Sequence, residues 1–220
     1  MARAILGRLH VITDEVLQTR FSHAELAAMA TRGGADTVQY REKRPRLTRE
    51  LVADASAVVA ACAANGASCI VDDRADVTAA AGAHGLHLGR DDLAPAVARR
   101  LLGPDVLLGG TANSIEEARE VWQRSIDYLG VGPVYGTQSK ANPAPVLGIP
   151  QLRAIVRQCP VPVIAIGSIT AGRVAEVLEA GAYGIAVLSA ITCAADPEAA
   201  ASEFANAIAQ WLASHEGVKA

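Results

Sequence analysis

Several short polar motifs in this sequence hold residues suited to binding phosphate groups. In the motif Q-Y-R-E-K at 39–43, Arg41 and Lys43 alternate with Glu42. Alternate side chains of an extended segment point to the same side, so Arg41 and Lys43 would converge while Glu42 points away. Two converging cations suit a phosphate or diphosphate group. The alternative interpretation is a solvated strand end.

Two carboxylates in similar positions are candidates for a metal site. Asp73 lies in the motif D-D-R, and Asp92 ends the motif G-R-D-D. Mg²⁺ prefers hard oxygen ligands and is often held by one or two carboxylates together with substrate phosphates. Because each aspartate precedes a stretch of helical character, the alternative role is to cap a helix N-terminus.

Other segments offer donors for a second anion. Exposed backbone N–H groups are expected at Gly167, Ser168 and Ser189, and hydroxyl or ammonium groups at Thr137, Ser139 and Lys140. Ordinary turns and a solvated loop are the alternatives. His87, between Leu86 and Leu88, is either a core histidine or a site residue near a strand end.

These motifs follow short apolar runs that alternate with stretches of helical character. We expect strands at Leu9–Thr13, Thr37–Tyr40, Ser68–Val71, Gly85–Leu88, Val106–Gly109, Tyr128–Gly132, Val163–Ile166 and Gly184–Leu188. We expect helices at Ala24–Thr31, Arg49–Ala64, Ala75–Ala81, Ala94–Leu102, Ile115–Arg124, Pro150–Gln158, Ala171–Ala180 and Pro197–Ala213. Glycines after several helices, at Gly33-Gly34, Gly66, Gly82, Gly103 and Gly181, suit left-handed C-terminal caps.

Eight strand–helix alternations predict an α/β fold, a (β/α)8 TIM barrel formed by one domain over residues 1–220. The alternative is an open doubly wound sheet, but no G-x-G-x-x-G motif follows the first strand. In a barrel, function gathers at the carboxyl ends of the strands. The polar motifs follow the expected strands, and residues 136–147 form the longest irregular stretch, a candidate active-site loop.

The composition narrows the class of protein. Of 220 residues, 51% are hydrophobic but only 4% aromatic, which favours an aliphatic core of parallel strands covered by helices. A net charge of -3 without a basic patch gives no support for a nucleic-acid partner, and no apolar run is long enough to span a membrane. Residues 1–7 lack a signal-peptide stretch, so we expect a cytoplasmic protein. The four cysteines, without metal-ligand spacing, are expected to be small buried residues.

Taken together, the motifs resemble those of the thiamine-phosphate synthase family. The matching segments are Q-x-R-E-K at 39–43, [N/D]-D-R-x-D at 72–76, H-L-G-x-x-D at 87–92, G-P-V-[FY]-x-T-x-[ST]-K at 132–140, A-I-G-x-I-T at 165–170 and V-x-S-A-I at 187–191. Each is weak alone, but six in order at strand ends are specific. The family joins a hydroxymethylpyrimidine diphosphate to a hydroxyethylthiazole phosphate with Mg²⁺ and releases pyrophosphate.

The resemblance implies roles for individual residues. Gln39, Arg41 and Lys43 would contact the pyrimidine diphosphate beside Asp72, while Asp73 and Asp92 would hold Mg²⁺. His87 and Thr111, the latter in place of the family's usual serine, would line the pyrimidine pocket. The thiazole phosphate and the leaving group would be met by Thr137, Ser139, Lys140, Gly167, Ser168, Leu188 and Ser189. The partners implied are small molecules; a homo-oligomer is left open.

Four positions depart from the family pattern. Asp72 stands where asparagine is usual, Arg90 where glutamine is usual, Gly136 in place of proline and Ser168 in place of glycine. One hypothesis is that Asp72 and Arg90 offset each other in charge beside the diphosphate.

Two other functions compete with synthesis of thiamine phosphate. The related thiazole tautomerases share the barrel and the thiazole phosphate site, but typically lack the metal aspartates and use a histidine after the fifth strand, where this chain has Asn113. A non-catalytic barrel that binds a phosphorylated ligand is the other alternative. Asp73 and Asp92 favour the synthase over both.

Overall fold

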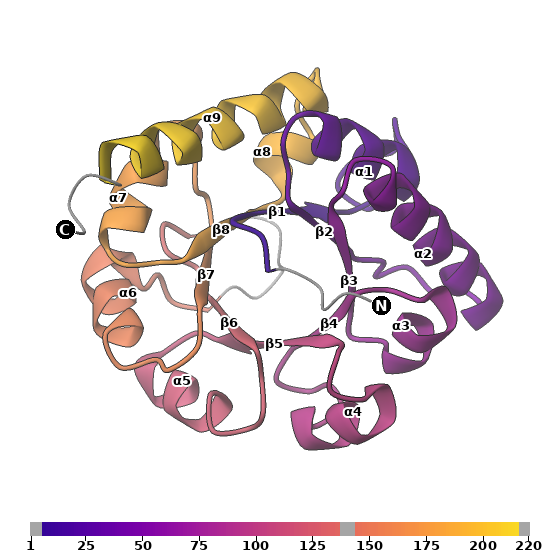
Figure 1. The fold of residues 1–220 in the computed structure, drawn as a ribbon, viewed down its shortest axis with the longest axis horizontal. Coiled ribbons are helices and arrows are strands. Elements are labelled where there is room, and N and C mark those ends of the chain that lie inside the picture. Colours follow the sequence, from indigo (N-terminus) through magenta and orange to yellow (C-terminus); the bar gives the residue numbers. More distant parts are fainter. Residues whose placement is uncertain (1–5, 137–143, 216–220) are drawn as a thin grey trace.

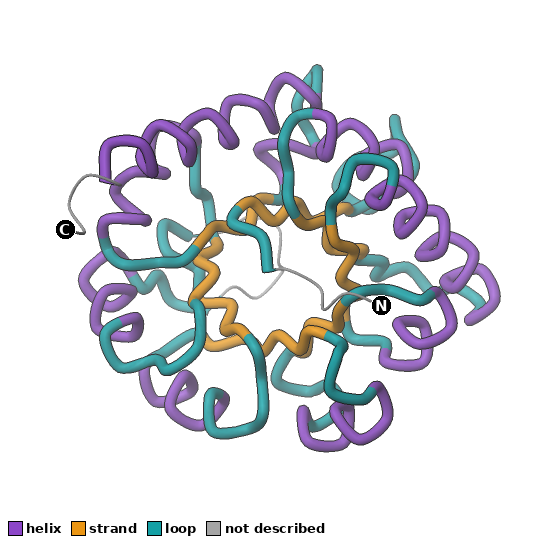
Figure 2. The backbone as a smooth tube through the Cα atoms, in the orientation of Figure 1, coloured by secondary structure: helices purple, strands orange, loops and turns teal. Residues whose placement is uncertain are grey.

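The computed structural model describes residues 6–136 and 144–215 and forms a closed (β/α)8 barrel. Eight parallel strands form an inner ring, and helices surround it (Figures 1 and 2). The strands are β1 Leu9–Thr13, β2 Thr37–Tyr40, β3 Ser68–Asp72, β4 Gly85–Leu88, β5 Leu107–Ala112, β6 Tyr128–Val131, β7 Val163–Ile166 and β8 Gly184–Val187. Strand β8 pairs with β1 and closes the ring. The predicted TIM barrel is confirmed, and the open sheet is excluded.

The outer layer follows the same alternation. It consists of α1 His23–Arg32, α2 Thr48–Ala63, α3 Ala75–Ala81, α4 Pro95–Leu102, α5 Ile115–Val121, α6 Gly148–Val156, the 3₁₀ turn η1 Ala171–Arg173, α7 Val174–Glu179, α8 Ser189–Thr192 and α9 Pro197–His215. The hydroxyl of Ser22 caps α1 in a capping box, and Ser114 caps α5 by accepting from the backbone N–H of Glu117. No described helix is long and apolar enough to cross a membrane.

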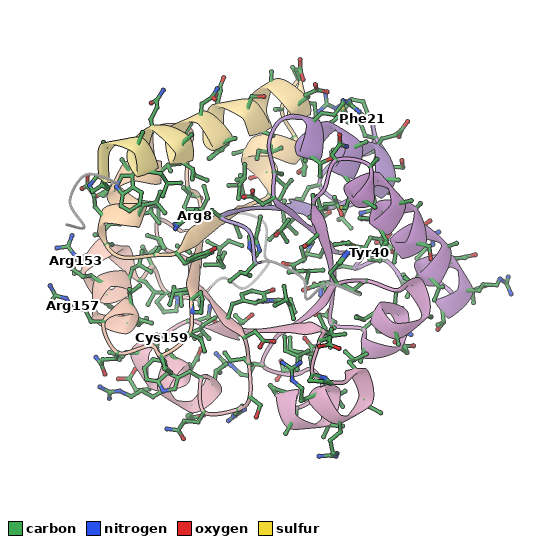
Figure 3. The ribbon with its side chains drawn as sticks, in the orientation of Figure 1. Arg8, Phe21, Tyr40, Arg153, Arg157 and Cys159 are labelled. Carbon is green, nitrogen blue, oxygen red and sulfur yellow. The ribbon has the colours of Figure 1, made fainter. Side chains whose placement is uncertain are left out.

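Two layers of side chains make up the core. Alternate residues of each strand face outward, so Leu9 and Val11 pack against the helices in a large aliphatic cluster. Ile12, Ile70 and Ile164 face inward and fill the barrel interior. Figure 3 shows side chains inside the ring, while Arg153 on α6 and Arg157 just after it point outward from the helical layer. These two layers support the strand ends, where the cavity opens.

Several boundary predictions were wrong in detail. Strand β5 runs on to Ala112, so Thr111 lies within the strand rather than after it. The expected helix at 115–124 ends at Val121, and the one at 171–180 begins as a 3₁₀ turn. The short helix α8 directly after β8 was not predicted, because four residues carry no helical periodicity.

Two expectations about single residue types also need correction. The glycines after the helices have a positive φ, as left-handed caps require, at positions 34, 66, 82 and 181. Gly103 also has a positive φ, but its ψ of -178° lies outside the left-handed helical region, and Gly33 has a φ of -73°. Cys62 and Cys69 are buried as expected, whereas Cys159 is half-buried and Cys193 is exposed. Cys193 lies in the turn after α8, where the chain leaves the barrel wall.

Candidate functional site

A cavity of about 960 Å³ lies at the carboxyl ends of the strands, and all the predicted site residues that the structure describes line it. They are Gln39, Arg41, Lys43, Asp72, Asp73, His87, Asp92, Thr111, Gly167, Ser168, Leu188 and Ser189. Thr137, Ser139 and Lys140 lie outside the described residues. The structure therefore brings residues from six strands to one rim, while the role of each residue stays a prediction.

Cations and carboxylates alternate in one corner of this cavity. The Nζ of Lys43 lies 2.8 Å from Oδ2 of Asp72 and also pairs with Asp73. The amide of Gln39 donates to Oδ1 of Asp72 at 2.7 Å. Because β2 and β3 pair with Tyr40 opposite Val71, the register places Arg41 beside Asp72, with 3.8 Å between Nε and Oδ2. Arg41 and Lys43 are therefore already held side by side in this corner, where both could contact a diphosphate.

Mutual contact shifts the pKa values in this corner. Burial raises the pKa of Asp72, and the neighbouring charge of Asp73 adds to the rise. Burial also opposes ionisation of Asp73, but the hydrogen bond and charge of Lys43, together with Asp92 and His87, outweigh it and lower that pKa. Burial tends to lower the pKa of Lys43, yet the carboxylate of Asp72 prevails and raises it. Lys43 therefore stays charged between the two acids.

Asp73 and Asp92 have the chemistry of a divalent-metal pair. Their carboxylates are close enough to hydrogen-bond to each other, and burial together with Asp73 raises the pKa of Asp92. A hard cation bound between the two carboxylates would offset the repulsion between their negative charges. Neither residue caps a helix, since Arg74 precedes α3 and Ala94 precedes α4. Asp73 also has a left-handed φ of 64°, an uncommon backbone conformation often found at functional sites.

A polar floor inside the barrel was only partly anticipated. His87 Nδ1 lies 3.0 Å from the hydroxyl of Tyr128, and its Nε2 lies 2.8 Å from Oγ1 of Thr111. His10 packs edge-on against the ring of Tyr128 at 5.7 Å. His10 and Tyr128 were missed because an inward-facing residue in an apolar run is expected to belong to the core. Both line the cavity, so the floor can orient a flat polar ring above it.

The opposite side of the cavity is a turn built from glycine and serine after β7. Gly167 has a φ of 113°, and a Cβ there would lie 2.6 Å from Cα of Pro133. Ser168 adopts a left-handed φ of 48° even though it carries a side chain. Arg173 donates to the carbonyl of Ser168 at 3.0 Å, which fixes that carbonyl on the helix side of the turn. Leu188 and Ser189 border the same space at the start of α8.

Behind the cationic segment lies a second charged cluster. Glu42 points away from the cavity as predicted, and both of its oxygens accept from Nε of Arg44, at 3.0 and 2.9 Å. His23 lies 3.5 Å from Glu42 and 3.8 Å from Glu15. Their spacing resembles that of metal ligands. However, the guanidinium of Arg44 pairs with both glutamates and already occupies one oxygen of each.

Arg90 does not pair with the carboxylate it was hypothesised to offset. Its guanidinium forms an ion pair with Glu117 on α5, and its side chain is 66% exposed. Glu117 in turn accepts from the backbone N–H of Asn113 at 2.7 Å. The extra charge of Asp72 is met by Lys43 instead.

A further carboxylate, Asp14, was missed although the strand-end rule applies to it. It follows β1 directly, is 1% exposed and pairs with Arg41. The signal was the acidic residue immediately after Leu9–Thr13, the one expected strand whose carboxyl end received no site assignment.

Fold and site together define a (β/α)8-barrel protein whose single cavity has a cationic corner on one side and a glycine–serine turn on the other. Residues 9–191 match the family model described as Thiamine monophosphate synthase. The chain therefore belongs to the thiamine monophosphate synthase family, which confirms the resemblance seen in its motifs.

Individual relatives agree over most of the chain. A thiamine-phosphate synthase of Salinibacter ruber is 47% identical over 94% of this chain and 91% of its own length. One from Methanospirillum hungatei is 43% identical over 90% of this chain and 96% of its own length. The solved structure of a thiamine phosphate pyrophosphorylase from Pyrococcus furiosus matches with a TM-score of 0.84 and 35% identity, covering 93% of this chain and 96% of that one. A 3-hexulose-6-phosphate synthase, 20% identical with a TM-score of 0.67, shares the fold alone.

Proposed function

We propose that this protein is a thiamine-phosphate synthase. It would transfer the pyrimidinylmethyl group of 4-amino-2-methyl-5-hydroxymethylpyrimidine diphosphate to hydroxyethylthiazole phosphate, forming thiamine phosphate and pyrophosphate. The observation that carries the proposal is the corner where Lys43 lies between Asp72 and Asp73 beside Arg41. A leaving diphosphate needs converging cations to balance its charge, whereas a proton transfer does not.

The described residues divide between the two substrates. Arg41 and Lys43 would bind the diphosphate, and Gln39, His87 and Thr111 would orient the pyrimidine ring over the Tyr128 floor. The turn at Gly167 and Ser168, with Leu188 and Ser189, would hold the thiazole phosphate. Family resemblance adds Thr137, Ser139 and Lys140 to the groups that meet the phosphates.

The reaction needs positioning and charge neutralisation rather than a protein nucleophile. The bond between the pyrimidine methylene carbon and the diphosphate oxygen breaks, and its electron pair leaves with the oxygen. The resulting cation is stabilised by the electron-rich aminopyrimidine and captured by the lone pair of the thiazole nitrogen. Arg41 and Lys43 stabilise the charge that develops on the leaving group, and the two ends of the cavity align the reacting atoms.

Asp73 and Asp92 fit a magnesium ion, because they supply two hard oxygen ligands next to the expected diphosphate. When bound, Mg²⁺ would neutralise negative charge on the leaving group. Lys43, which pairs with Asp73, would then be free to shift its contact toward the diphosphate.

The test is conversion of both substrates by the purified full-length chain with Mg²⁺, followed by chromatography of thiamine phosphate and an assay of released pyrophosphate. We expect Asp73→Asn and Asp92→Asn each to lower kcat/KM on the order of 100-fold. Asp76→Asn, which removes an exposed carboxylate paired with Arg74 on the first turn of α3, is the matched control and should retain activity. Binding of both substrates without product would refute the synthase proposal.

A further inference from the structure

We propose that Asp14 is a positioning residue that holds Arg41 in place for the diphosphate. The inference rests on the proposed function, because it assigns Arg41 to that anion. Strands β1 and β2 pair with Ile12 opposite Gln39 and Thr13 opposite Tyr40. One step further along both chains, this register brings Asp14 next to Arg41 on the cavity side.

Both oxygens of the Asp14 carboxylate are committed. Oδ2 pairs with Nη1 of Arg41. Oδ1 accepts from the backbone N–H groups of Val16 at 2.7 Å and Leu17 at 2.9 Å. With 1% exposure, this carboxylate is largely withheld from water, so its orientation is set by these partners. The β1–α1 loop and the Arg41 guanidinium are therefore held by one group.

Arg41 has a competing carboxylate within reach. Its Nε lies 3.8 Å from Oδ2 of Asp72, while Asp72 already binds Lys43 at 2.8 Å and Gln39 at 2.7 Å. Without Asp14, the guanidinium would move toward Asp72 and compete with Lys43 for it. Asp14 thus anchors Arg41 to the end of β1, while Lys43 is anchored to the end of β3, so that the two cations do not share one carboxylate.

The substitution Asp14→Asn separates the two interactions of this carboxylate, the hydrogen bonds to the β1–α1 loop and the ion pair with Arg41. The Oδ1 of asparagine can still accept from Val16 and Leu17, but its amide NH₂ then faces the guanidinium, donor against donor. The loop keeps its hydrogen bonds while Arg41 is displaced. Asp14→Ser, whose hydroxyl can accept the same backbone N–H groups, serves as a second variant should the asparagine variant not fold.

The opposite end of the barrel offers a matched control. Oδ2 of Asp127 accepts from the backbone N–H of Leu108 at 2.8 Å and from Nη2 of Arg99 at 2.5 Å. Asp127→Asn therefore also removes a half-buried Asp–Arg pair that supports a strand, but at the start of β5, on the far side from the cavity.

The experiment measures binding of inorganic pyrophosphate with Mg²⁺ by titration calorimetry to the full-length wild type, D14N, D127N, R41A and D14N/R41A. We expect D14N to weaken binding about tenfold and D127N to leave it unchanged. The double variant should bind as weakly as R41A alone, because Asp14 acts through Arg41. The KM for the pyrimidine diphosphate should rise in D14N, while the KM for the thiazole phosphate stays constant.

Unchanged or tighter pyrophosphate binding in D14N would overturn the inference, as would an equal loss in D127N or a further loss from D14N in the R41A background. Wild-type protein that does not bind pyrophosphate would overturn it as well. Failure of the proposed function is a separate result: pyrophosphate binds to the wild type, but no thiamine phosphate forms, and the comparison of variants still decides the role of Asp14.

Discussion

His10, in the floor of the cavity, should make the protein less stable as the pH falls. Its ring is 1% exposed, and Nε2 lies 3.0 Å from the carbonyl oxygen of Gly7. A carbonyl only accepts, so Nε2 carries the hydrogen and the neutral ring fits the fold. Burial lowers the pKa of His10 from 6.5 to about 4; the hydrogen bond to Gly7 and the charge of Asp36 oppose the shift, and His87 adds to it.

The sign and size follow from proton linkage. Below pH 6.5 the unfolded chain takes up a proton at this histidine before the folded chain does, so stability falls with pH until about pH 4. The full effect is about 3 kcal/mol, of which about 2 kcal/mol is lost between pH 7.5 and pH 5.

Urea unfolding followed by circular dichroism at pH 7.5 and pH 5 measures this loss. In His10→Gln, which can still donate to Gly7 but cannot titrate, we expect the loss of stability between the two pH values to shrink by about 2 kcal/mol relative to wild type. His215→Gln, at an exposed position at the end of α9, controls for the substitution itself. An equal loss in His10→Gln and wild type would refute the reasoning.

Three further predictions concern the turn, the floor and the cluster behind the cations. Gly167→Ala should destabilise by about 3 kcal/mol or more in thermal melts, because its Cβ meets the β6–α6 backbone, whereas Gly172→Ala, with open space around it, should be tolerated. Thr111→Val should lower kcat/KM about tenfold by removing the oxygen at 2.8 Å from His87 Nε2, and Thr111→Ser should retain activity. Burial opposes ionisation of Glu42, but Arg44 lowers its pKa to about 2, which adds stability that is lost as the pH falls from 4.5 toward 2. Glu42→Gln should therefore lower the free energy of unfolding by about 2 kcal/mol at pH 7. In urea titrations, the stability of this variant should also depend less on pH below 4.5 than that of the wild type.

Much of the barrel could be predicted because its signals are local. Strands β1, β2, β4 and β7 have the predicted bounds, since each is a short apolar run that is followed by a polar motif. Parallel strands place all their carboxyl ends on one rim, so residues far apart in sequence could be assigned to one site before any contact was known. The alternation of Arg41, Glu42 and Lys43 likewise followed from strand geometry.

The partner of each charge could not be predicted, because pairing depends on register and on competition in space. The sequence suggests that Arg90 offsets Asp72, but Arg90 reaches Glu117 on a neighbouring helix, and Lys43 takes its place. Tyr128 was assigned to a strand but not to the site, since its position in an apolar run is equally typical of a core residue. Its exposure to the cavity becomes evident only when the ring closes.

The ends of β1 and β2 are joined twice, and this double connection explains how the cationic corner keeps its shape. On the cavity side, Asp14 pairs with Arg41. On the helix side, Arg44 pairs with both Glu15 and Glu42. Because neighbouring residues of each segment take part on opposite sides, rotation of either segment would break pairs on both. The guanidinium of Arg41 is therefore held in place before an anion arrives, and binding costs less conformational entropy than ordering a free side chain would.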